Sequence, residues 1–235
     1  MNILAVESAS DTLHIALQTP EQYISHTHTI GRKFSEELVP RMKALCEEAH
    51  IRLKDLSLVV CSNGPGSFTG LRVGMSAAKG IALAADIPLV SLSTMEIHAF
   101  PLRHAGIPVL CVLDAKKHRF YGALFDHGNR IVKDTDATIG MMADMVAPYP
   151  AVLLAGPDAA RALPLLGDEV TKRGLHTKLL LDELKFRDYG ESMIILGRNL
   201  LDQSGPDDIA SGPTYIRKSD AEVSLEEKLN LVSER

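Results

Sequence analysis

The sequence predicts an α/β protein built from two similar halves. Strands and helices alternate along the chain, which is typical of α/β folds. A hairpin pattern near the N-terminus recurs about a hundred residues later. The length of 235 residues, with 46% hydrophobic and 23% charged residues, suits one large globular domain or two of ordinary size.

The two hairpin patterns occupy residues 3–17 and 109–125. Each has an apolar strand, a polar turn and a second apolar strand, and in each the first strand ends on an acid, Glu7 or Asp114. Chance likeness between two short hairpins is the alternative explanation. Pro, Arg, His and Gly cluster over 101–108. We therefore expect an N-terminal half over 1–102 and a C-terminal half over 103–235.

Helical spacing of apolar residues begins at Phe34. Pro40 fits only in a first turn or at a bend, so the regular helix is expected to start near Leu38. The remaining predicted elements are, in order, a buried strand over 56–61, a helix over 68–85, strands over 88–92 and 151–155, a helix over 191–203, an extended segment over 213–217 and a charged tail.

Bulk features exclude several classes of protein. Cys46, Cys61 and Cys111 lie in apolar segments without disulfide or zinc spacing, which indicates buried thiols in a reducing cytoplasm. The N-terminus lacks the pattern of a signal peptide, and no uncharged apolar run reaches membrane-spanning length. A formal charge of −5 disfavours a chain that grips nucleic acid by itself. We expect a cytoplasmic protein without membrane contact, whose RNA contacts come through a partner.

A glycine-rich segment over 63–74 reads Asn-Gly-Pro-Gly-Ser-Phe-Thr-Gly-Leu-Arg-Val-Gly. It follows a strand and opens a helix, as phosphate-binding loops do. However, it lacks the Gly-Lys pair of a Walker loop, and its Gly66-to-Gly70 interval is one residue too long for a dinucleotide fingerprint. A tight turn before a close-packed helix is the structural alternative.

Small residues line one face of this helix, because Gly70, Gly74 and Ala78 fall four positions apart. Glycine in a helix costs up to about 1 kcal/mol relative to alanine and is best tolerated where another backbone approaches. That backbone belongs either to the protein's own strand layer or to a partner's helix.

The glycine segment closely resembles the TsaB (YeaZ) family, non-catalytic relatives of the threonylcarbamoyl transferase TsaD. Further matches are the opening Ile-Leu-Ala-Val-Glu-Ser, the turn at Asp114 with Tyr121, and a late Pro-x-Tyr-x-Arg at 213–217 followed by Ala-Glu at 221–222. The likeness is strong over 1–125 and thinner over 126–205. It implies the actin-like ATPase (acetate-kinase/sugar-kinase/Hsp70/actin) superfold, with two ribonuclease-H-like halves.

The same resemblance implies a role without catalysis. Catalytic relatives carry a metal-binding His-x-x-x-His where this chain has Thr94-Met-Glu-Ile-His98. One imidazole and one alcohol make a poor transition-metal site, so no metal, cofactor or catalytic residue is expected. A glycoprotease role is disfavoured for the same reason. His98 is expected to be structural or at the surface.

The implied role is that of a scaffold for TsaD, within machinery that includes the ATPase TsaE and modifies N6 of adenosine 37 in tRNAs reading ANN codons. Free chains could pair through the same surface. The resemblance places that surface on two helices, through Leu38, Met42, Leu45, Arg72, Val73, Gly74, Met75 and Ala78.

The competing hypothesis is a small ATP-dependent phosphotransferase of the same superfold. Acids from the two hairpins would hold a magnesium-bound phosphate, since magnesium takes one or two carboxylates plus phosphate oxygens. The residues expected around this cleft are Glu7, Ser8, Asp11 and Asp114. Only analogy of fold supports it.

Overall fold

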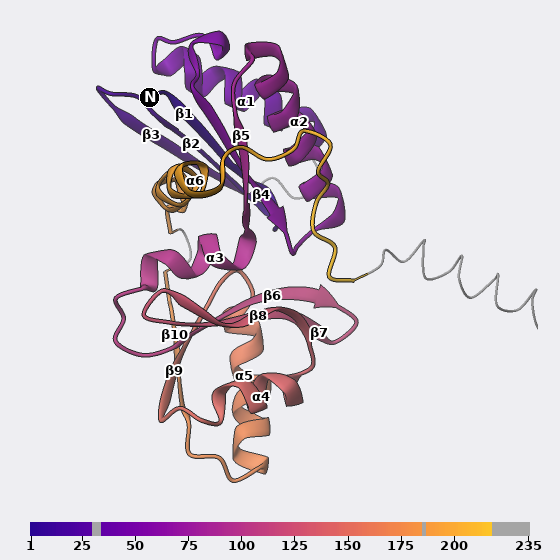
Figure 1. Cartoon of the computed structure of the whole chain (residues 1–235). Helices are drawn as coiled ribbons and strands as arrows, with labels where there is room; N and C mark the ends of the chain where they lie inside the picture. The colour runs from indigo at the N-terminus through magenta and orange to yellow at the C-terminus, as the bar shows by residue number, and fades with distance from the viewer. Residues whose placement is uncertain (30–33, 185–186, 218–235) are drawn as a thin grey trace, which may run out of the picture.

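A computed structural model of the chain describes residues 1–29, 34–184 and 187–217. Two sheets with their helices are stacked one above the other (Figure 1). The charged tail and the family match at 221–222 lie outside the described residues.

The first sheet has the strand order β3-β2-β1-β4-β5. Its strands are β1 (Ile3–Glu7), β2 (Thr12–Gln18), β3 (Tyr23–Thr29), β4 (Leu58–Gly64) and β5 (Leu89–Ser93). β1 pairs antiparallel with β2 and parallel with β4, and its five residues are all buried. The predicted hairpin therefore forms the centre of this sheet.

The second sheet repeats this arrangement with the order β10-β9-β6-β7-β8. Its strands are β6 (Val109–Lys116), β7 (Arg119–Asp126), β8 (Asn129–Ala137), β9 (Ala151–Ala155) and β10 (Lys178–Leu181). The second hairpin, β6–β7, occupies the position that β1–β2 holds in the first sheet, and β9 pairs parallel with β6 as β4 does with β1. The predicted α/β class with two ribonuclease-H-like halves is confirmed.

Six α-helices cover the sheets within the described residues: α1 (Phe34–Glu48), α2 (Phe68–Ala85), α3 (Thr94–Ala99), α4 (Ile139–Val146), α5 (Ala159–Lys172) and α6 (Gly190–Ser204). Two short 3-10 turns, η1 (Leu53–Asp55) and η2 (Phe100–Leu102), complete the elements. α1 and α2 share a core with one face of the first sheet, and α4 and α5 do so with one face of the second.

The short helix α3 lies between the two sheets (Figure 1). Ile97 packs into the core on the second face of the first sheet, whereas Met95 and Ala99 pack against β6, β7 and β9. All three side chains are nearly inaccessible to solvent. α3 is therefore the apolar joint between the halves.

The last helix, α6, returns to the first sheet (Figure 1). Met193 and Ile194 pack with Ile3, Ala5 and Val60 in one buried cluster. The division into 1–102 and 103–235 stays a prediction. By that division α6 belongs to the C-terminal half, although it covers the sheet of the N-terminal half.

One expectation about an individual element was wrong, and several elements were not predicted. α1 begins at Phe34, not near Leu38, and carries Pro40 inside it. Pro40 lies on the exposed face, where the carbonyl group of exposed Glu36, left without its helical donor, can be hydrated. The strands β3, β8 and β10 and the helices α3, α4 and α5 had no predicted counterpart.

The three cysteines are free, buried thiols, as predicted. Burial raises the pKa of Cys61 and Cys111 to about 12, which keeps both thiols protonated and unreactive. Over the described ranges, no helix combines the length and the apolar character needed to cross a membrane.

Candidate functional site

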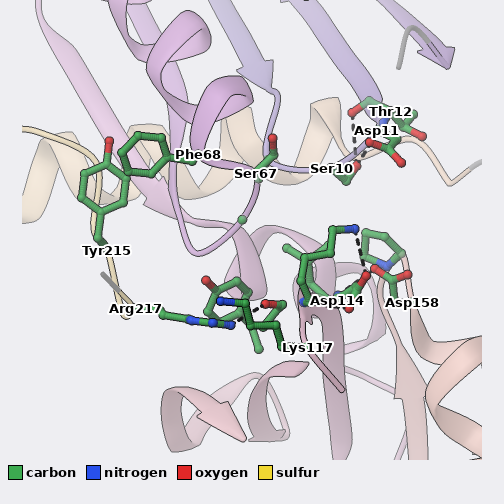
Figure 2. A pocket seen from close by; sticks show the side chains of 17 residues that line it. Ser10, Asp11, Thr12, Ser67, Phe68, Asp114, Lys117, Asp158, Tyr215 and Arg217 are labelled. Atoms are coloured by element: carbon green, nitrogen blue, oxygen red, sulfur yellow. Dashed lines mark hydrogen bonds and ion pairs between the residues drawn. The ribbon is translucent and has the colours of Figure 1, made fainter. Parts of the chain in front are cut away.

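A cleft of about 420 Å³ lies between the two halves. Figure 2 shows side chains from both sides converging on it. The first half contributes the turn after β1 and the start of α2, and the second contributes the turn after β6 and the loop before α5. Its polar and aromatic lining includes Ser10, Asp11, Thr12, Ser67, Phe68, Asp114, Lys116, Lys117, Tyr121, Asp158, Tyr215 and Arg217.

Asp114 is the acid in this cleft that pairs with two cations. Its Oδ2 atom lies 2.9 Å from Lys116 Nζ and 2.7 Å from Arg161 Nη1. Burial raises the pKa of Asp114, but hydrogen bonds from Lys116 and Arg161 outweigh burial, and the pKa is lowered overall. The cleft thus holds a carboxylate that is already neutralised by the protein's own cations.

Asp158 supports Asp114 from the loop before α5. Its Oδ2 accepts a hydrogen bond from the Asp114 backbone N–H at 2.8 Å. Burial, together with the charge of Asp114, raises the pKa of Asp158 above its ordinary value. The pair places two acids at one end of the cleft, with Lys116 beside them.

The cleft does not bring together the four residues expected of a phosphotransferase. Asp11 and Asp114 line it, whereas Glu7 and Ser8 are buried and face the interior. Glu7 Oε1 accepts the Ala9 N–H at 2.6 Å, and Ser8 Oγ donates to the Gly70 carbonyl at 3.0 Å. The expectation was wrong because the strand end that carries Glu7 is covered by neighbouring elements. Over the described ranges, no group of three His, Cys, Asp or Glu side chains could hold a metal ion.

Glu7 instead belongs to a buried polar cluster that meets α3. His98 Nε2 lies 3.8 Å from Glu7 Oε2, which is too far for a hydrogen bond. The rings of His14 and His98 lie against Tyr189, with centroids 5.0 and 4.1 Å away. Thr94 Oγ1, both ring nitrogens of His98 and Glu7 Oε2 are buried without a hydrogen-bond partner among the described residues.

Burial affects the two titratable neighbours of His98 differently. Burial raises the pKa of Glu7, but His98 and His14 nearby and the Ala9 N–H outweigh it, so the pKa is lowered overall. Burial lowers the pKa of His14 to about 4, against the attraction of Glu7. Glu7 is therefore ionised and His14 neutral at pH 7. His98 lies in the interior, as expected if its role is structural.

The glycine segment is shaped by close packing within the chain. A Cβ atom at Gly66 would overlap Ala9, and one at Gly70 or Gly74 would overlap Ser8. Ser67 caps α2 by accepting the Gly70 N–H at 3.3 Å. The small face of α2 thus meets the protein's own strand layer, the first of the two alternatives.

The same packing corrects most of the predicted partner surface. Six of its eight residues are buried within this chain: Leu38, Met42, Leu45, Gly74, Met75 and Ala78. They face the first sheet because apolar periodicity marks the face turned to the core. Arg72 is exposed and Val73 is half-buried, so these two remain at the surface.

Three aromatic and basic cleft residues were assigned no role from the sequence. Phe68, Tyr215 and Arg217 come from the start of α2 and from the segment after α6. The late Pro-x-Tyr-x-Arg pattern was noted only as a family match. No local pattern signals that residues 143 positions apart, such as Arg72 and Tyr215, will meet.

Comparisons with known proteins identify the family. The family model for TsaD, described as tRNA N6-adenosine threonylcarbamoyltransferase, matches residues 14–164. The tRNA threonylcarbamoyladenosine biosynthesis protein TsaB of Bacillus subtilis (strain 168) is 29% identical over 180 residues, 74% of this chain and 79% of that protein. The chain belongs to the TsaD-type family, in its TsaB (YeaZ) group.

Other relatives of the TsaB (YeaZ) group agree. TsaB of Escherichia coli (strain K12) is 29% identical over 125 residues, 52% of this chain and 54% of that protein. The solved structure of YeaZ from Pseudomonas aeruginosa has a TM-score of 0.68 at 20% identity, covering 91% of this chain and 99% of that chain. A second structure, described as an uncharacterized protein with similarity to peptidase YeaZ from Pseudomonas aeruginosa, has a TM-score of 0.72 at 20% identity and covers 92% and 99%. Both structures support the fold.

Proposed function

We propose that this chain is a non-catalytic subunit of the machinery that makes threonylcarbamoyladenosine in tRNA, and that it acts by binding TsaD. The observation that carries the proposal is the buried site around Thr94 and His98. The catalytic relatives that the chain resembles have a metal-binding histidine in place of Thr94. Here Thr94 and His98 are at most 1% exposed, and Glu7 is the acid beside them. An alcohol in the place of that histidine, beside His98 and sealed from solvent, does not fit a transition-metal centre.

The proposed contact with TsaD uses the solvent-facing sides of α1 and α2. Arg72 and Val73 remain from the predicted surface, and two exposed apolar side chains join them, Val39 on α1 and Leu83 on α2. Leu83 is 65% exposed. Large apolar side chains in water are well suited to become the buried core of an interface.

Within this proposal, TsaD supplies the transfer chemistry and TsaE is the ATPase of the machinery. The tRNA is contacted through the assembled complex, in keeping with the formal charge of −5. The family names of the relatives support the process in which the chain acts. Without TsaD, the same helix faces would pair two copies of the chain.

A matched pair of substitutions tests the proposed surface. Leu83→Asp places a charge on α2, whereas Leu165→Asp does the same at a 47% exposed position on α5. We expect Leu83→Asp to weaken capture of TsaD at least tenfold, about 1.4 kcal/mol, and to reduce tRNA modification in a reconstituted assay. Leu165→Asp should do neither. Equal binding by both variants would contradict the surface, and full modification without the chain would contradict the function.

The phosphotransferase hypothesis is not proposed. Its four residues are divided between the cleft and the interior, and Asp114 is already paired with Lys116 and Arg161. Titration calorimetry of the purified chain with ATP and magnesium separates the two hypotheses. Tight nucleotide binding followed by phosphate transfer would favour the rejected one.

A further inference from the structure

The segment after α6 crosses the first half before it reaches the second. In Figure 1 it runs from the end of α6 past β5 and α2. The Asp207 N–H donates to the Leu89 carbonyl at 2.8 Å, and its carboxylate accepts the Ser91 hydroxyl at 2.5 Å. Farther on, the Thr214 N–H donates to the Asn63 carbonyl at 2.7 Å. Residues 207–214 are thus fastened by backbone and side chain to the first sheet.

Tyr215 fixes the end of this segment to the start of α2. Its ring stacks on Phe68 with centroids 4.7 Å apart and planes 29° from parallel. Arg72 Nε donates to Tyr215 Oη at 2.9 Å, while its guanidinium lies 3.8 Å from the Phe68 ring centroid. Stacking and cation–π contacts of this kind stabilise the pair beyond the area that it buries.

Two residues later, Arg217 reaches the second half. Its Nη1 donates to the Ala115 carbonyl of β6 at 3.1 Å. Tyr215 and Arg217 both line the cleft, and in Figure 2 the Tyr215 ring lies beside Phe68 while the Arg217 side chain extends toward the second half. A single short segment therefore holds α2 at Tyr215 and β6 at Arg217.

A different set of contacts joins the halves at α3. Met95 and Ala99 pack against the second sheet. Ser93 Oγ donates to Asp134 Oδ2 at 2.6 Å, and Arg130 Nη2 lies 3.2 Å from Glu96 Oε2. These contacts are numerous and mostly apolar, so they suit a permanent joint. The contact at Arg217 is polar and lies at the cleft.

We infer that residues 207–217 form a strap that holds the two halves closed over the cleft, with α3 as the hinge. The Arg217 end is the release point, because its hydrogen bond to the Ala115 carbonyl is polar, half-exposed and lies at the cleft. Tyr215 remains packed on α2 when the hydrogen bond of Arg217 breaks. Access to the cleft is then governed by residues 207–217.

Distances between spin labels on the two halves of the full chain test the strap. Ser76→Cys on α2 and Lys172→Cys on α5 provide exposed attachment sites, while the three native cysteines are buried. We expect a narrow distance distribution in the otherwise unchanged chain. Arg217→Ala should broaden it and shift it to longer distances, and Arg217→Ala with Tyr215→Ala should do so further.

Arg173→Ala is the matched control, because the partners of Arg173, Glu169 and Asp144, lie within the second half. Circular dichroism verifies that each variant is folded, and Arg217→Ala alone decides the matter if the double variant unfolds. A distribution that Arg217→Ala leaves unchanged would overturn the strap. So would an equally broad distribution in the chain without strap substitutions.

Discussion

Glu7 and Asp114 occupy equivalent places in the two halves, yet their environments are opposite. Each ends or nearly ends the central strand of its sheet, at the turn of a hairpin. Glu7 is fully buried against His98, whereas the Asp114 side chain, 8% exposed, lines the cleft beside the exposed cations Lys116 and Arg161. Because the fold repeats, each half carries an acid at the same place on its sheet. The elements packed around that strand end decide whether the acid is sealed in the interior or lines the cleft.

The largest expected effect comes from removing the buried acid. Glu7→Ala takes a carboxylate from a site with no solvent contact and leaves the Ala9 N–H and His98 without it. A buried donor left without its acceptor costs about 1–3 kcal/mol, and the cavity left by the side chain adds to that loss. Urea unfolding at pH 7 measures the loss. A cost below about 1 kcal/mol would show that Glu7 contributes no more to stability than an acid at the surface.

Acid conditions should destabilise the first half through protonation of His14. The folded chain keeps His14 neutral down to a pH of about 4, while the unfolded chain protonates it below about 6.5. The unfolded state binds more protons in that window, so stability falls as pH falls through it. The loss from pH 7 to pH 5 should be about 2 kcal/mol.

Urea unfolding of His14→Gln at both pH values checks this assignment. The substitution should remove most of the pH-dependent loss. His176→Gln, at an exposed position in the second half, should leave the loss in place. An unchanged loss in His14→Gln would assign it to another group.

Close packing in the first half also predicts opposite outcomes for two glycines of α2. A Cβ at Gly74 would overlap Ser8, so Gly74→Ala should destabilise by about 1–3 kcal/mol. Nothing lies within 4 Å of a Cβ at Gly80, so Gly80→Ala should stabilise by up to about 1 kcal/mol. Thermal unfolding compares the two, and a shift of the same sign in both would contradict the packing.

The smallest expected effect belongs to the acid in the cleft. Asp114→Ala removes a side chain that is only 8% exposed, but it leaves behind Lys116 and Arg161, whose side chains are 79% and 55% exposed and stay hydrated. The cost should be about 0.5–1.5 kcal/mol, the net contribution of a typical hydrogen bond. The free energy of unfolding of both variants is measured in the same urea series. If Asp114→Ala costs as much stability as Glu7→Ala, the contrast between the two acids is wrong.

The elements that the sequence predicted and those that it missed differ in a physical way. β1, β4 and β6 are continuous apolar runs because they are buried in the middle of their sheets. β3 and β8 lie at sheet edges and carry exposed polar side chains, so their sequences lack an apolar run. The duplicated hairpin was enough to predict the two-part fold.

The candidate site was less predictable because it depends on contacts between distant segments. Periodicity in α1 and α2 found the apolar faces correctly, but a pattern cannot tell a protein's own sheet from a partner. Leu38 and Ala78 were therefore placed on a surface that they do not reach. Tyr215 joins the cleft only through the path of the chain after α6.

The return of α6 to the first sheet has a consequence for synthesis on the ribosome. Strands β1 and β4 present Ile3, Ala5 and Val60 on the face that Met193 and Ile194 later cover. At the usual rate of translation, that face waits about 10–40 s for its last helix. The N-terminal half is made first but completed last, so a nascent chain released before residue 204 would carry an open apolar surface.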